Sequence, residues 1–293
     1  MKSIGEMLKQ VRENLGLTQE QIANKIASQS SIQKIESGKR NPSYNTIISI
    51  TDKLCIPYDE LLYVQNEFQL STRNKLVFDF QNLGNSLHKD AFNQLNQDLS
   101  DYLNKHDDFQ LRDLQAVLQS IICFQESQSF TKPRPIVKPI WDRLEKQDDW
   151  YNFDLYLLSH IFYIFEPETA DEIIAKLLKN IDKYEHYNQN PKFKLSFLLN
   201  IVTYYRHHER ILDSEKLIEQ ALEIARACAF DTHQKTAEYA KAEVLFLQGE
   251  TKKATELANH VFSFFELLKN EPNKKAILDD LKNDWAVLTE KKI

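Results

Sequence analysis

The chain has 293 residues, enough for two domains that each bury a hydrophobic core. It contains only five glycines, whereas sheets with tight turns and phosphate-binding loops consume many more, so we expect an almost wholly α-helical fold. The net charge is −6, yet the first 42 residues hold seven Lys or Arg and four Glu, a net +3 that leaves −9 for the remainder. A mostly acidic chain with one modest basic patch excludes a protein that binds polyanions by charge alone, without sequence preference.

Nothing in the sequence predicts secretion or a membrane span. Charged residues interrupt the first ten positions, and the longest apolar run, residues 157–165, is broken by Ser159 and His160. The three cysteines lie far apart without CxxC spacing and cannot all pair within one chain; they are Cys55, Cys123 and Cys228. We therefore expect buried or inert thiols in a soluble, cytoplasmic protein that has no membrane partner.

Helical periodicity begins near the N-terminus. The apolar residues Ile4, Leu8, Val11 and Leu15 recur at helical spacing, and Gly16 ends this first helix. We expect the helix to pack on the two helices that follow it.

The next stretch, TQEQIANKIASQSSIQKIESGKRNP over residues 18–42, predicts two helices joined by a turn. Thr18 followed three residues later by Gln21 is a capping-box start for the first of them. Ser28 can cap the second helix, and Gly38 supplies the left-handed residue after its end. Each helix has an apolar face for the core, which consists of Ile22, Ala23, Ile26, Ile32 and Ile35.

The second helix of this pair leaves a polar face exposed. Its residues are Gln29, Ser30, Gln33, Lys34 and Ser37. Amide, hydroxyl and ammonium groups are the chemistry that meets base edges and phosphates, whereas an ordinary solvated face would mix Glu with Lys. We therefore predict a DNA-recognition helix, with a small helical bundle that merely has a polar face as the plainer alternative.

The loop after this helix, Lys39-Arg40-Asn41-Pro42, carries cationic and amide groups that can reach phosphates beside the groove. Two more helices complete a small core, one over residues 47–54 and one opened by Pro57. We assign residues 1–65 to a helix-turn-helix DNA-binding domain and residues 66–293 to a second domain.

The segments LTQEQIA, SSIQKIESGKRNPS and IISITDKLCIPYDELL resemble the helix-turn-helix domain of the phage-repressor-like (XRE) family of bacterial regulators. The resemblance implies that Gln19 holds a phosphate and that the residues at Gln29, Ser30, Gln33 and Lys34 face the major groove. One departure from the family pattern is that the usual glycine of the turn is absent. Ile26-Ala27-Ser28 stands in its place, and the turn is one residue shorter.

Beyond residue 70 the chain repeats a helix, a break and a second helix about every 40 residues. The five predicted pairs begin near Ser71, Phe109, Trp150, Pro191 and His233, and a last helix covers about 273–290. Breaks are expected at Gly84-Asn85 or Lys89-Asp90, at Pro133–Pro135, at Pro167, at Leu212-Asp213 and at Gly249-Glu250.

The fifth pair, YAKAEVLFLQGETKKATELANHVF, resembles a tetratricopeptide (TPR) repeat. Small residues are expected where its two helices cross closely, namely Ala242, Gly249, Ala254 and Ala258. Stacked repeats of this kind bury a continuous core and curve into a superhelix with a concave groove.

A helix-turn-helix ahead of five such repeats resembles the Rgg and PlcR group (RRNPP) of Gram-positive regulators. QSSIQKIESG and KLCIP carry the resemblance in the first domain, and DDWYNFDLYLLSHIF and KLSFLLNIVTYY carry it more loosely in the second. The resemblance implies a cytosolic, quorum-sensing transcription factor whose repeat domain captures a short peptide pheromone.

The sequence contains no HExxH, Gly-rich phosphate loop, GxSxG or Cys/His cluster at metal spacing. We therefore expect no enzyme activity, no metal site and no cofactor. Adjacent helical residues point about 100° apart, so His207-His208 is expected to be solvated or to line a groove. The tryptophans are expected in the core between helices; they are Trp141, Trp150 and Trp285.

Three functions compete at this point. The favoured one is a transcriptional regulator gated by a peptide in the repeat groove. The second is a DNA binder whose repeats only dimerise or dock another protein. The third is an interaction scaffold that binds or sequesters a protein partner, with DNA binding secondary.

The predicted peptide site lies on the first helices of the third and fourth pairs, Tyr151 to Phe165 and Lys192 to Tyr205, which superpose at a shift of 41 residues. Asn200 stands inside an apolar run, where a buried amide needs a partner. In the family that the chain resembles, groove asparagines hold the peptide backbone. The full predicted set is Ser159, His160, Tyr163, Asn200, Tyr204 and His207.

One recognition helix covers too little of the groove for tight specific binding, so we also predict a two-fold homodimer on a pseudo-palindromic, double-stranded DNA operator. The repeat domain, through its last helix with Trp285, is the expected clamp between the two copies.

Overall fold

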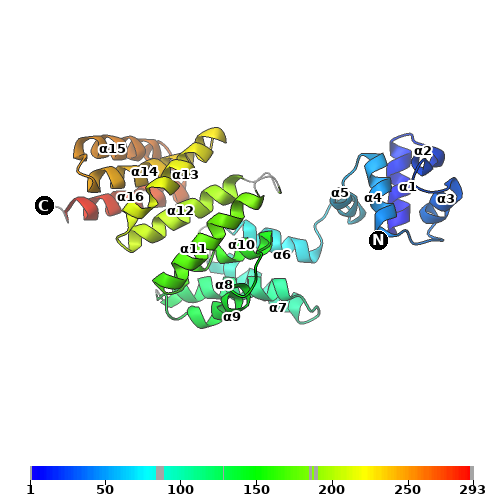
Figure 1. Cartoon of the computed structure of the whole chain (residues 1–293), viewed down its shortest axis with the longest axis horizontal. Coiled ribbons are helices and arrows are strands. Elements are labelled where there is room, and N and C mark those ends of the chain that lie inside the picture. Colours follow the sequence, from blue (N-terminus) through cyan, green and yellow to red (C-terminus); the bar gives the residue numbers. More distant parts are fainter. Residues whose placement is uncertain (1, 84–88, 128, 185–186, 188–190, 291–293) are drawn as a thin grey trace. The chain divides into compact units, whose positions relative to one another are not determined.

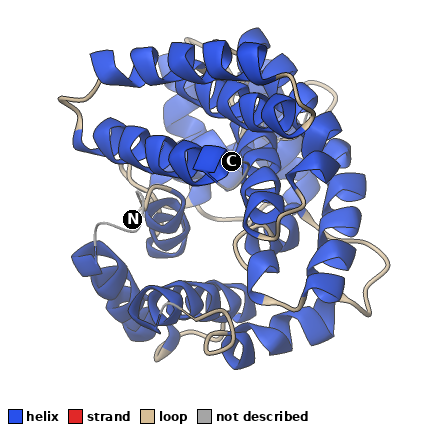
Figure 2. Cartoon of the chain, turned by 90° about the vertical axis from the view of Figure 1, so that its left-hand side faces the viewer, coloured by secondary structure: helices blue, strands red, loops and turns tan. Residues whose placement is uncertain are grey.

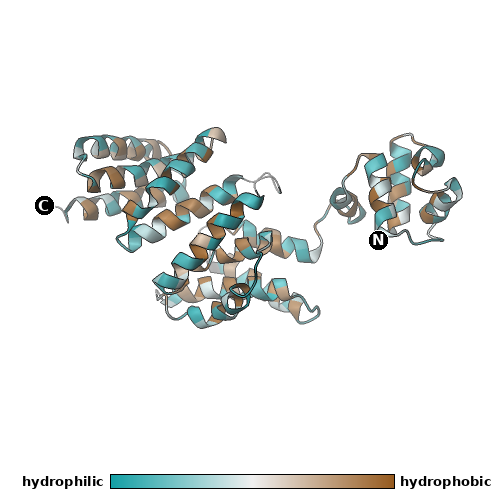
Figure 3. Ribbon diagram, viewed as in Figure 1, coloured by the Kyte–Doolittle hydropathy of each residue, from teal (hydrophilic) through white to brown (hydrophobic). Residues whose placement is uncertain are grey.

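The structure, a computed structural model, describes residues 2–83, 89–127, 129–184, 187 and 191–290. Within these ranges every regular element is a helix, as the sparse glycine predicts (Figure 1, Figure 2). Apolar and hydrophilic stretches alternate along the helices (Figure 3). The chain divides into two compact units, residues 1–83 and 84–293, a division further along the chain than the boundary predicted after residue 65.

The first unit begins with the five helices that the sequence predicts. It comprises α1 (Ile4–Asn14), α2 (Gln19–Ala23), α3 (Gln29–Glu36), α4 (Tyr44–Leu54), α5 (Tyr58–Gln65) and α6 (Thr72–Gln81). Helix α6 is the first helix of the predicted repeats, yet it falls in the same compact unit as α1 to α5.

Side-chain caps decide where these helices begin. The Thr18 hydroxyl accepts from the Gln21 N–H at 3.2 Å, and the Gln21 side-chain oxygen accepts from the Thr18 N–H at 2.7 Å, so the predicted capping box is present. The Ser28 hydroxyl accepts from the Ser31 N–H at 3.2 Å and caps α3. Each such cap stabilises its helix by about 1 kcal/mol.

Helix α3 ends as predicted at Gly38, which has a left-handed φ of 70°. The Gly38 N–H donates to the Ile35 carbonyl at 3.0 Å, and the Lys39 N–H donates to the Lys34 carbonyl at 2.8 Å. This pair of bonds is a Schellman motif, which satisfies carbonyls that the helix leaves open.

The shortened turn between α2 and α3 places Lys25 in the left-handed region, with a φ of 65°. That conformation costs an L-residue with a side chain about 1–2 kcal/mol. The turn therefore forms without the usual glycine, at a cost in strain that the core packing of the unit offsets.

The core of the first unit lies where α1 crosses α3. A Cβ added at Gly5 would stand 2.0 Å from the Ile35 carbonyl oxygen, so only glycine allows this close approach. The buried apolar cluster around the crossing comprises Met7, Leu8, Ile22, Ala23, Ile32, Ile35, Ile50, Leu54 and Leu61.

The second unit is a succession of helix pairs. It comprises α7 (Lys89–Leu103), α8 (Phe109–Ser127), α9 (Arg134–Leu144), α10 (Asn152–Leu158), α11 (Pro167–Ile181), α12 (Pro191–His207), α13 (Glu215–Ala227), α14 (Asp231–Leu247), α15 (Thr251–Leu267) and α16 (Pro272–Glu290). The predicted breaks near Pro133, Pro167, Leu212 and Gly249 are confirmed. The break predicted at Gly84-Asn85 lies outside the described residues, and α7 begins at Lys89.

Helix α10 is shorter than predicted. It ends at Leu158, and the residues up to Phe165 form turns around a short 3-10 helix, η1 (Phe162–Ile164). The Ser159 hydroxyl donates to the Tyr156 carbonyl at 2.7 Å, and His160 Nδ1 lies 2.8 Å from the same oxygen. These side chains occupy the acceptor that the next helical N–H would use, so the helix stops there.

The TPR-like crossing of α14 and α15 is present, with one correction. Ala242, Ala254 and Ala258 are fully buried. Gly249 is exposed in the turn with a φ of 92°, so its role is to end α14 rather than to allow close packing. The four small positions therefore serve two different functions in the repeat.

A buried ion pair joins α12 to α14. Arg206 Nε lies 2.8 Å from each carboxylate oxygen of Glu243, and the guanidinium stands 5.4 Å from the Tyr239 ring centroid. Burial raises the pKa of Glu243 to about 7, although Arg206 opposes this shift. The pair fixes the register between α12 and α14, although its two side chains lie 37 positions apart in the sequence.

Buried or inert thiols are expected from the sequence, and the structure shows that none of the three cysteines is fully buried. All three cysteines are free; Cys55 is exposed, and Cys123 and Cys228 are half-buried. Cys55 lies directly after α4 with a left-handed φ of 52° and ends that helix.

Replacing Lys25 with glycine should stabilise the first unit by about 1 kcal/mol, because glycine adopts a positive φ without the steric cost. Hydrogen exchange of the Ile22 and Ile35 amides measures the change. The control is Lys9→Gly on the exposed side of α1, which should destabilise the unit by about 1 kcal/mol. A destabilising Lys25→Gly would contradict the strain assigned to this turn.

Candidate nucleic-acid interface and ligand surface

Helix α3 presents the polar face that the sequence predicts. Gln29, Ser30, Gln33, Lys34 and Ser37 are all exposed. Ile32 and Ile35 on the opposite face are buried at 1% and 3% exposure. The helix is therefore anchored on one side and offers amide, hydroxyl and ammonium groups on the other.

The two ends of α3 carry further polar groups. The Ser30 and Ser31 hydroxyls lie 3.0 and 2.9 Å from the Ser28 hydroxyl, and Arg40 Nη1 donates to the Ser31 hydroxyl at 3.3 Å. The loop residues Lys39 and Arg40 are exposed. Arg40 thus reaches back to the first turn of α3 and places its charge beside the polar face.

A buried ion pair holds this helix to α1. Arg12 Nε donates to Glu36 Oε1 at 2.6 Å and Arg12 Nη2 donates to Glu36 Oε2 at 2.9 Å, while Nη1 donates to the Leu17 carbonyl at 2.7 Å. Arg12 is 8% exposed and Glu36 is 5% exposed. The hydrogen bond to Glu36 raises the pKa of Arg12, so its guanidinium stays protonated.

Glu36 also positions Gln19, the predicted phosphate-binding residue. Gln19 Nε2 donates to Glu36 Oε2 at 2.8 Å, and the side chain is half-buried. A primary amide has a second N–H, which this bond leaves available. The sequence patterns did not predict the pair between Arg12 and Glu36. The only signal is that each is a charged residue at the edge of the apolar face of its helix.

The structure separates the predicted peptide residues into two groups. Ser159, His160 and Tyr163 lie beyond the last residue of α10 and are not part of that helix. They therefore do not form one helix face together with the predicted residues of α12. Ser159 is 3% exposed, and burial lowers the pKa of His160 and raises that of Tyr163 to about 12. Tyr163 packs edge-on against Phe124, with centroids 6.2 Å apart.

The α12 residues also differ in exposure. Asn200 and His207 are exposed, so the argument that Asn200 is a buried amide in need of a partner is wrong. Tyr204 is 5% exposed and packs against Phe162, with centroids 5.5 Å apart. Burial raises the pKa of Tyr204 to about 12. Asn200 and His207 remain as a solvent-facing pair two helical turns apart.

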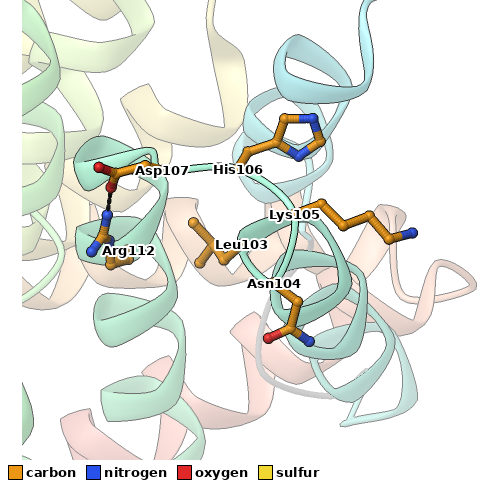
Figure 4. Close-up of a pocket in the computed structure, with 6 residues that line it drawn as sticks. All are labelled: Leu103, Asn104, Lys105, His106, Asp107 and Arg112. Atoms are coloured by element: carbon orange, nitrogen blue, oxygen red, sulfur yellow. Dashed lines mark ion pairs between the residues drawn. The ribbon is translucent and has the colours of Figure 1, made fainter.

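One open hollow lies at the turn between α7 and α8 (Figure 4). Its lining residues are Leu103, Asn104, Lys105, His106, Asp107 and Arg112. Asp107 and Arg112 form an ion pair on one side of it, at the start of α8, and the His106 ring stacks on Tyr102 at 4.1 Å. It contains none of the predicted peptide residues.

Over the described ranges, no three His, Cys, Asp or Glu side chains come together as a metal site. In the same part of the chain, no helix is both long enough and apolar enough to span a bilayer.

A helix-turn-helix unit followed by stacked helix pairs defines the class of protein as a regulator of the helix-turn-helix type. Residues 5–67 match the model of a helix-turn-helix domain family, and residues 74–277 match the C-terminal domain of the HTH-type transcriptional regulator Rgg. The chain belongs to this Rgg family, which confirms the resemblance noted in the sequence.

Solved structures share the fold over nearly the whole chain. A protein of Listeria monocytogenes EGD-e assigned as a transcriptional regulator is 21% identical, with a TM-score of 0.76 over 99% of this chain and 98% of that one. ComR of S. thermophilus, solved with DNA and its signalling peptide ComS, is 16% identical, with a TM-score of 0.66 over 96% and 99%.

PlcR of Bacillus thuringiensis, solved with the peptide PapR7 and DNA, is 19% identical, with a TM-score of 0.62 over 94% of this chain and 99% of that one. At these identities the likeness establishes the fold. No curated protein sequence matches the chain significantly.

Replacing Glu36 with alanine should destabilise the first unit by about 3–5 kcal/mol, because Arg12 would remain buried without a counter-charge. The double variant Arg12→Met/Glu36→Met should recover most of this loss. Denaturant unfolding followed by hydrogen exchange in α1 and α3 measures both.

The matched control is Lys75→Ala, which breaks the solvent-exposed pair between Lys75 and Asp79 in α6 of the same unit. That loss should stay below about 1 kcal/mol. Equal losses for Glu36→Ala and Lys75→Ala would contradict the role given to the buried pair.

Proposed function

We propose that this chain is a sequence-specific, DNA-binding transcriptional regulator whose activity is controlled by a short signalling peptide bound to its repeat unit. The observation that carries the proposal is the exposed polar face of α3, held in place by the buried Arg12–Glu36 pair. The Rgg family match supports it. So do ComR and PlcR, which share the fold and were solved with DNA and a peptide. A cytoplasmic location follows from this function.

The first turn of α3 enters the major groove in this proposal. Gln29 and Ser30 reach base edges, Gln33 continues that face, and Lys34, one turn on, meets a guanine or a phosphate. The phosphate contacts come from Gln19, Ser37, Lys39 and Arg40. The second N–H of Gln19, which the bond to Glu36 leaves available, serves this purpose.

Replacing Gln29 with alanine should weaken binding to a selected operator by about 1–3 kcal/mol and change binding to random DNA little. The operator is obtained by selection from random duplexes. Gln19→Ala and Lys39→Ala serve as controls, since loss of a phosphate contact should weaken binding to all sequences. Equal losses for Gln29→Ala on both DNAs would show a backbone contact only.

The proposed assembly is a two-fold homodimer on a pseudo-palindrome with half-sites about one helical turn, roughly 34 Å, apart or a multiple of that distance. Trp285 packs inside its own chain, 5.5 Å from Phe246 and 6.2 Å from Tyr239 between ring centroids. Trp285 is therefore poorly placed as the clamp. Exposed apolar residues in the last two helices are better candidates, namely Leu267 and Val287.

A selected operator should contain two related half-sites, and light scattering of the complex should give two chains per duplex. A single chain bound with full affinity to one half-site would exclude the dimer. Leu267→Lys should favour the single chain if α15 contributes to the contact, because a buried unpaired charge is costly.

The peptide surface proposed here centres on the exposed pair Asn200 and His207 on α12. The other residues predicted from the sequence are packed or hydrogen-bonded within the chain, namely Ser159, His160, Tyr163 and Tyr204. The Asn200 amide offers both a donor and an acceptor, which match the N–H and C=O of an extended peptide. Because Asn200 is exposed, it is free to bind without first breaking a core contact.

Replacing Asn200 with alanine should abolish the effect of the peptide on DNA binding and leave the thermal midpoint and peptide-free DNA affinity nearly unchanged. The peptides are octapeptides selected on the wild-type chain. Asn259→Ala on the exposed side of α15 is the control and should respond as the wild type does. An Asn200 variant that still responds would remove this residue from the site.

The alternative, a repeat scaffold that binds or sequesters a protein partner, shares the same helical stack. It differs in DNA binding, which should then be weak, steeply salt-dependent and without sequence preference. Enrichment of one operator in the selection would exclude it.

A further inference from the structure

The Arg40 residue is fixed at both of its ends. Its backbone N–H donates to the Lys34 carbonyl at 3.1 Å, in the last turn of α3. Its guanidinium Nη1 donates to the Ser31 hydroxyl at 3.3 Å, in the first turn of the same helix. Ser31 and Lys34 lie on one edge of α3, because residues three positions apart are neighbours on a helix surface. The Arg40 side chain therefore follows this edge and places its charge at the start of the helix.

Ser31 belongs to a chain of hydroxyl groups at this first turn. Its Oγ lies 2.9 Å from the Ser28 Oγ, which in turn lies 3.0 Å from the Ser30 Oγ. Ser31 is half-buried, whereas Ser28, Ser30 and Arg40 are exposed. The hydroxyl that accepts from Arg40 is thus held in place by the helix, and it sets the position of the guanidinium.

The Arg40 guanidinium keeps most of its bonding capacity. An arginine side chain has five N–H donors in a rigid fork, and the bond to Ser31 uses one of them. Over the described ranges, the Arg40 side chain has no second hydrogen-bond acceptor and no carboxylate partner. Arg12 in the same unit is different, because it is paired with the Glu36 carboxylate. The charge of Arg40 and its Nε–Nη2 edge are therefore open to a ligand.

An open guanidinium edge in the major groove has a preferred partner. Guanine presents two acceptors there, O6 and N7, and a bidentate arginine is the commonest specific contact to that pair. Phosphates flank the groove, so an arginine that only binds phosphate can extend from the loop into solvent. Arg40 instead follows α3 to the turn that the proposed function places inside the groove.

We infer that Arg40 reads a guanine beside the bases that Gln29 and Ser30 contact, beyond the phosphate contact proposed for it above, and that Ser31 positions it to do so. The inference rests on the proposed function and adds a specificity-determining residue that lies outside the recognition helix. Ser31 is a positioning residue in this role, because it acts through Arg40.

The test is selection of operators from random duplexes by the full chain and by the variants Arg40→Ala and Lys39→Ala. The wild type should select a guanine in each half-site that Arg40→Ala no longer selects. By fluorescence anisotropy, replacing that G·C pair with A·T should weaken wild-type binding about tenfold and Arg40→Ala binding less than about twofold. Lys39→Ala should bind all duplexes more weakly and keep the guanine preference, since a phosphate contact carries no sequence information.

Conservative variants separate the charge of Arg40 from its geometry. Arg40→Lys should keep the salt dependence of binding and lose the guanine preference, because an ammonium is a point charge without the planar fork. Ser31→Ala should reduce the preference several-fold and leave the salt dependence and the thermal midpoint unchanged, because Arg40 keeps its charge and loses only its support. Ser31→Thr, which retains a hydroxyl, should restore the preference.

Equal losses for Arg40→Ala on all duplexes, with the wild-type base preference retained, would overturn the base contact and leave the proposed function intact. A Ser31→Ala variant that keeps the full guanine preference, or that melts earlier and binds every duplex more weakly by the same factor, would overturn the positioning by Ser31. If the wild type selects no operator, sequence-specific binding fails and the base contact fails with it.

Discussion

The buried ion pair between Arg12 and Glu36 is the interaction on which the DNA-binding unit depends. It joins α1 to the last turn of α3, and through Glu36 it also orients Gln19 on α2. Charges taken out of water are stable only when fully paired, so the geometry of the three helices is restricted to the one that pairs them. The close crossing at Gly5 adds a steric constraint at the same place.

The repeat unit also contains an ion pair between two helices. Arg206 and Glu243 are paired between α12 and α14, and Tyr239 covers the guanidinium. Apolar packing alone tolerates small shifts between neighbouring helices, whereas a bidentate pair does not. One such pair in each unit therefore sets the positions of helices that present polar groups to solvent, α3 in the first unit and α12 in the second.

Polar groups in the candidate sites divide into those that are exposed and those that are already satisfied. Gln29, Gln33 and Asn200 are exposed and available to a ligand. The Ser159 hydroxyl donates to the Tyr156 carbonyl, and Tyr204 is packed against Phe162. The sequence pattern identified all of these as polar positions on helices. It could not distinguish the two groups, because exposure depends on which neighbouring helix covers each face.

The sequence by itself determined the all-helical class, the order of the helices, most of their ends and the polar face of α3. These features depend on contacts within a few residues, such as the Thr18–Gln21 capping box and the left-handed Gly38. Tertiary structure alone decided the Arg12–Glu36 pair, the Arg206–Glu243 pair and the exposure of Asn200. Those contacts join residues far apart in the chain or depend on what covers a helix, and no local spacing encodes the packing that brings them together.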